Sequence, residues 1–126
     1  MKRSLVIIML LAAISLSVAA EPKISFEQTT LSTGSFPEND PIRKVSFTFT
    51  NTGDQPLVVN QAVASCGCTV PQYTKAPVKP GEQGTIEVTY NGTGKFPGHF
   101  KKTITVRTNG TPETIRLYIE GDMTEK

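Results

Sequence analysis

Apolar and polar residues alternate along most of the chain after residue 22, and no segment there keeps a helical period. In the clearest example, residues 45–50, valine and phenylalanine alternate with serine and threonine. Alternation over four to eight residues is typical of a β-strand with one buried face. The chain is therefore predicted to form β-sheets that bury their valine, isoleucine, leucine and phenylalanine side chains on one side.

The alternation recurs in short segments separated by turn residues. Prolines at 71, 77 and 80 exclude a long central strand between residues 69 and 84. Glycine, proline and asparagine crowd the stretch 33–41, which is predicted to be a loop, and Asn109-Gly110 predicts a hairpin. The predicted strands are residues 24–26, 45–49, 57–64, a short edge strand within 72–75, 85–90, 100–108 and 114–121.

Six or seven short strands within about 100 residues favour an all-β fold, an antiparallel immunoglobulin-like β-sandwich. A small barrel is the alternative. There is no tryptophan, and the two cysteines are too close in sequence to bridge two sheets, so the pattern excludes an antibody-type domain.

The first 20 residues have the pattern of a secretory signal peptide. The charged pair Lys2 and Arg3 precedes an apolar stretch that ends at Leu16, and small residues then fit cleavage after Ala19 or Ala20. An uncleaved anchor is the alternative, but the stretch is shorter than the roughly 20 residues that cross a bilayer. The expected domains are a signal peptide at 1–20, a sandwich at 21–121 and a C-terminal tail at 122–126. We expect a periplasmic or extracellular location, with no membrane span after cleavage.

The charge balance excludes one class of partner. Cleavage removes two of the thirteen basic residues and leaves eleven against eleven acidic ones, so the mature net charge is about zero. Nucleic-acid binding depends on neutralising phosphates with basic residues. A neutral chain without a basic run is therefore not expected to bind nucleic acid.

Both cysteines lie in one short motif, Ser65-Cys66-Gly67-Cys68-Thr69, directly after the predicted strand 57–64. Cα atoms two residues apart are separated by about 5.5–7 Å, which overlaps the disulfide range of about 4.4–6.8 Å. An oxidising compartment favours the bridge, although closing so short a loop gains only about 1.6 kcal/mol. A strained and exposed bridge exchanges with other thiols, and reduced cysteines bind soft metal ions. A structural pair, a redox pair and a metal site all stay open for Cys66 and Cys68, with Ser65, Gly67 and Thr69 forming the turn around them.

His99 is the single histidine, so a catalytic triad or a multi-histidine metal site would depend on it alone. In a seven-strand sandwich with a short strand near Tyr73, the connections that hold the cysteines and His99 emerge at the same end. Without that strand, His99 lies at the far end. Convergence would give a metal site of Cys66, Cys68 and His99. No phosphate-binding loop, nucleophile elbow or zinc-protease motif is present, so we predict no catalytic residue and no cofactor.

With these motifs in view, the chain resembles a family of exported bacterial proteins of unknown function. The resemblance covers nearly all of the mature chain. It implies a periplasmic or surface immunoglobulin-like sandwich, related in fold to pilus-chaperone, sperm-protein and cilia-associated domains, and it supplies no activity. The matching segments are Phe49-Thr50-Asn51-Thr52-Gly53, Pro56-Leu57, Ser65-Cys66-Gly67-Cys68-Thr69, Pro80-Gly81-Glu82 with Ile86 and Val88, and Phe100-Lys101-Lys102-Thr103-Ile104-Thr105-Val106.

The sequence thus predicts a secreted or periplasmic, non-enzymatic β-sandwich module for protein binding or envelope structure. Its partner is expected to be a protein or another envelope component, and exposed strand edges are the expected means of recruiting an extended peptide. The alternative is a thiol redox or soft-metal-binding protein that uses Cys66 and Cys68.

Overall fold

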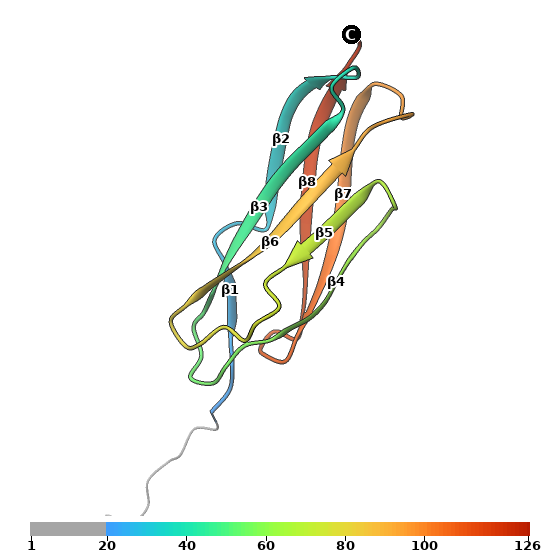
Figure 1. The fold of residues 1–126 in the computed structure, drawn as a ribbon. Coiled ribbons are helices and arrows are strands. Elements are labelled where there is room, and N and C mark those ends of the chain that lie inside the picture. The colour runs from blue at the N-terminus through green and yellow to red at the C-terminus, as the bar shows by residue number, and fades with distance from the viewer. Residues whose placement is uncertain (1–19) are drawn as a thin grey trace, which may run out of the picture.

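The computed structural model describes residues 20–126. The predicted signal peptide lies outside these residues, apart from Ala20. The described chain forms eight strands in an elongated sandwich, with its C-terminus at one end (Figure 1). The strands are β1 (Ile24–Phe26), β2 (Thr30–Pro37), β3 (Ile42–Asn51), β4 (Val59–Ala64), β5 (Thr69–Tyr73), β6 (Gln83–Asn91), β7 (Gly98–Thr108) and β8 (Thr114–Thr124).

Two four-stranded sheets pack face to face. One sheet has the order β1-β3-β6-β5 and the other has the order β2-β8-β7-β4. Neighbouring strands are antiparallel except β2 and β8, which run parallel. The predicted fold class, an immunoglobulin-like β-sandwich, is confirmed, and the barrel alternative is wrong because the structure has two separate sheets. Within residues 20–126, no helix has the length and apolar character that a membrane span requires.

The strand count exceeds the predicted six to seven because the stretch 33–41 is not simply a loop. Its first half belongs to β2, which pairs with β8, and Phe36 there is only 2% exposed. Gly34 has a φ of +74° and lies in a register shift that interrupts the alternation. Pro37 ends the strand at the edge of the sheet, where a missing N–H is tolerated. Because Gly34 and Pro37 interrupt the alternation of apolar and polar residues, the strand could not be predicted from it.

The other strand boundaries differ from the predictions by a few residues. β5 begins at Thr69 and not at residue 72, because the chain pairs with β6 directly after Cys68. β8 continues to Thr124, beyond the predicted start of the tail, and Met123 is buried. Leu57 contributes an isolated bridge to Val78 before β4 begins.

The core consists of the inward side chains that the alternation predicts. Phe49 is fully buried, its ring lies 5.5 Å from that of Phe26, and its register partner on the neighbouring strand β6 is Gly84, which packs under the ring. The apolar side chains with 0–1% exposure are Phe47, Phe49, Leu57, Ile86, Val88, Ile104, Val106, Leu117 and Ile119.

The polar side chain of Asn51 is fully buried and ties together the end of the sandwich where β1 begins. Its Nδ2 donates to the carbonyls of Gln55 at 2.7 Å and Val78 at 2.9 Å. Its Oδ1 accepts from the backbone N–H groups of Lys23 and Gly53. The Asn51 side chain, at the end of β3, therefore joins the residue before β1, the β3–β4 connection and the segment before β6.

Candidate functional site

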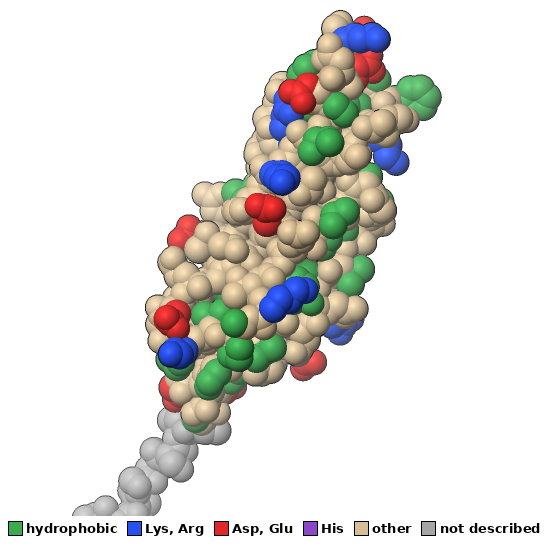
Figure 2. Space-filling model, in the orientation of Figure 1, with side chains coloured by type: hydrophobic (Ala, Val, Ile, Leu, Met, Phe, Trp, Pro, Cys, Tyr) green, Lys and Arg blue, Asp and Glu red, His purple; other side chains and the backbone are tan. Residues whose placement is uncertain are grey.

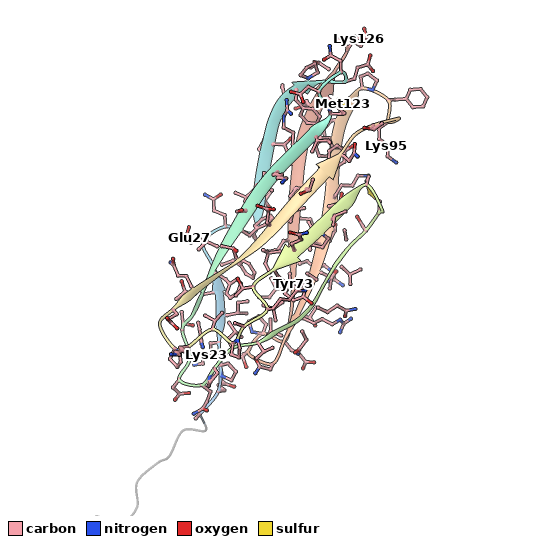
Figure 3. The ribbon with its side chains drawn as sticks, in the orientation of Figure 1. Lys23, Glu27, Tyr73, Lys95, Met123 and Lys126 are labelled. Carbon is pink, nitrogen blue, oxygen red and sulfur yellow. A yellow bond between two sulfur atoms is a disulfide. The ribbon has the colours of Figure 1, made fainter. Side chains whose placement is uncertain are left out.

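The two cysteines lie in the connection between β4 and β5, which are edge strands of opposite sheets. The structure joins Cys66 and Cys68 in a disulfide, with their Cα atoms 5.3 Å apart. In Figure 1, β4 runs toward the end of the sandwich that carries the C-terminus, and the connection turns at the side of the sandwich before that end is reached. Figure 3 shows the side chains that surround it.

Backbone hydrogen bonds hold this connection independently of the sulfur–sulfur bond. Ser65 N–H donates to the Thr103 carbonyl on β7 at 2.9 Å, and Ser65 Oγ accepts from Thr103 N–H. Asn91 N–H donates to the Cys68 carbonyl at 2.8 Å, which ties the connection to β6. Thr69 N–H closes the turn onto the Cys66 carbonyl. The motif is thus anchored to both sheets.

Thr69 places its hydroxyl against the disulfide. The residue is only 3% exposed, and its Oγ1 lies 3.6 Å from Cys68 Sγ and 3.8 Å from Cys66 Sγ. Within residues 20–126, the Thr69 hydroxyl has no hydrogen-bond partner other than these two sulfurs. The sequence analysis placed Thr69 in the turn but assigned its hydroxyl no role.

Gly67 is exposed and places no side chain between the two cysteines. A Cβ added at this position would meet no atom within 4 Å outside residues 66–68. Its backbone is also not in the left-handed region, so the turn does not require glycine for conformational reasons. Cys66 and Cys68 are each partly exposed.

His99 lies at the same end of the sandwich, because the short strand β5 is present and β7 begins there. Its ring turns to β8, on the other side of β7 from β4. Nδ1 lies 3.1 Å from Asp122 Oδ1, and Nε2 lies 3.9 Å from Glu120 Oε2. No three His, Cys, Asp or Glu side chains in the described part of the chain are grouped as metal ligands. The site of Cys66, Cys68 and His99 stays a prediction for the reduced protein.

A shallow groove of about 320 Å³ lies beside the motif, on the outer face of β4 and β7. Val63 in this groove is 48% exposed, and Arg107 supplies its positive charge. The sequence analysis missed the groove because it depends on which strands are neighbours. Its lining residues are Gln61, Val63, Ala64, Ser65, Thr103, Thr105 and Arg107.

Beside this groove, β4 presents an unpaired edge. Ser65 N–H points to β7, and backbone groups alternate along a strand, so the N–H and C=O groups of Ala62 and Ala64 point away from the sheet. At the start of the strand, the Tyr73 hydroxyl donates to the Asn60 carbonyl at 3.4 Å. Within residues 20–126, no strand is hydrogen-bonded to this side of β4, so the outward groups of Ala62 and Ala64 have no ladder partner.

The four edge strands differ in their protection against pairing with another chain. β1 has three residues, β2 contains Gly34 and Pro37, and β5 contains Pro71. β4 has six residues without proline, glycine or charge, and its register shift lies at its start, between Val59 and Gln61. Short length, proline, bulges and charge are the usual means of blocking an edge, so β4 is the edge best suited to accept a further strand.

The family model described as "Protein of unknown function (DUF1573)" matches residues 24–123. The chain belongs to this family. The match spans all eight strands except the last residue of β8, so the family assignment covers both the cysteine motif and the β4 edge. The recognition made from the sequence motifs is confirmed. No curated protein matches the chain.

Several solved structures share the fold at low sequence identity. A protein of unknown function from Porphyromonas gingivalis W83 is 15% identical, with a TM-score of 0.69. The match covers 86% of the present chain and 50% of that protein, so the present chain spans about half of its length. PapD-like domain 7 of human CEP192 is 9% identical, with a TM-score of 0.60, and the match covers 90% of this chain and 94% of that domain. The periplasmic chaperone SfaE is 13% identical, with a TM-score of 0.56, and the match covers 82% of this chain and 58% of the chaperone. At these identities the likeness shows a shared PapD-like fold.

Proposed function

We propose that the mature chain is an exported, non-enzymatic β-sandwich that binds a partner protein by adding a strand of that partner beside β4. The observation that carries the proposal is the uncharged β4 edge, with the outward backbone groups of Ala62 and Ala64. The likeness to a periplasmic chaperone supports both export and protein binding. In β-augmentation, backbone hydrogen bonds supply affinity and side-chain pockets supply selectivity.

The groove defines the chemistry of the partner strand. Val63 offers an exposed apolar contact, and Arg107 is the groove's only charged residue. A partner strand with an apolar residue facing Val63 and an acidic residue facing Arg107 would match both. On the face drawn in Figure 2, acidic and basic side chains are interspersed, so that face offers no strong electrostatic alternative.

The test compares two exposed valines on edge strands. The partner is first recovered from an envelope extract on the mature protein and purified, and its dissociation constant is then measured by calorimetry. Val63→Lys on β4 is expected to weaken binding about tenfold, because the lysine replaces an apolar contact and repels the approach of a further strand. Val70→Lys on β5 is the matched control, since Val70 is 52% exposed, and it is expected to bind as wild type does.

A second variant tests the backbone contacts. Ala62→Pro removes one outward N–H without removing a hydrogen bond to β7, and it is expected to weaken binding at least tenfold. Circular dichroism verifies that each variant is folded. Equal affinity of wild type, Val63→Lys and Ala62→Pro for the purified partner would contradict the proposal, as would the absence of any specific partner.

A further inference from the structure

We propose that Cys66–Cys68 is a thiol–disulfide exchange site that accepts two electrons from a protein dithiol, and that the Thr69 hydroxyl stabilises the thiolate released in the exchange. The proposal does not depend on strand addition at β4, because it concerns the sulfur chemistry of the β4–β5 connection. It rests on three features of this connection: the small structural role of the bridge, the open approach to it, and the buried hydroxyl.

The disulfide contributes little to holding the fold. It joins residues only two positions apart, and closing so short a loop constrains the unfolded chain weakly. The hydrogen bonds from Ser65 to β7 and from Asn91 to Cys68 hold the connection without it. The connection therefore keeps its place when the bridge opens, as a site that cycles between two redox states requires.

The two sulfurs differ in their surroundings. Cys68 packs against the hydrophobic core, whereas Cys66 does not belong to that cluster. Cys66 and Cys68 are both partly exposed, and Gly67 between them carries no side chain that could cover the bridge, so an incoming thiol can reach it. In the exchange, the attacking thiolate approaches one sulfur in line with the sulfur–sulfur bond, and the other sulfur leaves. The geometry points to Cys66 as the sulfur attacked and Cys68 as the sulfur that leaves.

Thr69 is placed to stabilise the leaving sulfur. Its buried Oγ1 lies closer to Cys68 Sγ, at 3.6 Å, than to Cys66 Sγ, at 3.8 Å. A disulfide sulfur is a weak acceptor, so the hydroxyl donates poorly in the oxidised protein. A thiolate is a charged acceptor, and hydrogen bonds to charged groups are about twice as strong as neutral ones. Thr69 thus acts as a positioning residue whose hydrogen bond strengthens on reduction.

The exchange consists of two successive thiolate attacks. One thiolate of the partner dithiol attacks Cys66 Sγ, which forms a mixed disulfide and breaks the Cys66–Cys68 bond. Cys68 leaves as a thiolate that accepts the Thr69 hydrogen bond and is then protonated from solvent. The partner's second thiolate attacks the mixed disulfide, forms the partner's own disulfide and releases Cys66. The partner loses two electrons, and this chain gains them as two thiols.

The test is the equilibrium of the mature protein with buffers of reduced and oxidised glutathione, measured by alkylation and intact mass spectrometry. Thr69→Val keeps the shape of the side chain and removes the hydroxyl. It is expected to lower the reduced-to-oxidised ratio about tenfold at pH 9, where thiolates are populated, and to change it little at pH 6. Thr69→Ser is expected to restore the wild-type ratio, and Thr48→Val on β3 is expected to match wild type throughout.

The pH dependence separates this role from packing. A loss of packing alone would shift the ratio equally at pH 6 and pH 9, and that outcome would overturn the role of Thr69. If Thr69→Val does not fold, the reduced wild type provides the test: its lower thiol pKa should lie below that of the same protein in urea. Equal pKa values would overturn the proposal, as would a folded protein whose disulfide resists reduction by glutathione.

Discussion

Replacing Asn51 with leucine is expected to lower the free energy of unfolding by about 3–5 kcal/mol, although the two side chains are similar in size. The Asn51 side chain makes four hydrogen bonds in a fully buried position. Leucine would leave two carbonyls and two N–H groups without this partner. An unsatisfied buried polar group costs about 1–3 kcal/mol. Water molecules that enter the site and hydrogen-bond to these groups recover part of that loss. Urea denaturation followed by circular dichroism measures the difference.

Two further variants sharpen this test. Asn39→Leu changes an exposed asparagine in the β2–β3 connection and is expected to alter stability by less than about 0.5 kcal/mol. Asn51→Asp keeps the acceptor but turns a carboxyl oxygen toward the Gln55 and Val78 carbonyls. The introduced carboxyl should then have a raised pKa in the folded state, so stability falls as pH rises above about 4. Equal stabilities of Asn51→Leu and Asn39→Leu would contradict the proposed role.

The long strands could be predicted from the sequence because their inner faces pack on a single core. Phe47 and Phe49 of β3 are buried, whereas Lys44 and Ser46 on the same strand are exposed, so the alternation directly records burial. β2 could not be predicted in the same way. It pairs in parallel with β8, almost ninety residues away, for example through Ser32 and Glu120. That pairing is determined by the assembled sheet and leaves little local trace in the sequence.

The candidate site was predicted in part for similar reasons. The cysteine pair is visible as a motif, and the short strand β5 places His99 at the same end of the sandwich. The role of the Thr69 hydroxyl is not visible, because it depends on the positions of two sulfurs relative to one buried oxygen. The β4 edge also depends on the sheet order, since a central strand of the same composition would have no free backbone groups.

Truncating Phe49 to alanine is expected to cost about 3–5 kcal/mol, the usual range for a fully buried phenylalanine. Its ring is 0% exposed and lies against Phe26 and the backbone of Gly84. Phe96→Ala is the matched control, because that ring is 95% exposed in the β6–β7 connection, and it is expected to change stability by less than about 0.5 kcal/mol. A loss below about 1 kcal/mol for Phe49→Ala on chemical denaturation would show that the ring does not fill the core.

The contact between Phe49 and Gly84 allows a sharper test by a double-mutant cycle. A Cβ added at Gly84 would overlap Phe49 Cζ, so Gly84→Ala is expected to cost about 1–3 kcal/mol through overpacking. Phe49→Leu removes the ring atoms that obstruct this Cβ. In the presence of Phe49→Leu, Gly84→Ala should therefore cost at least about 1 kcal/mol less than it does in the wild type. Additive losses would mean that the two residues do not share this space.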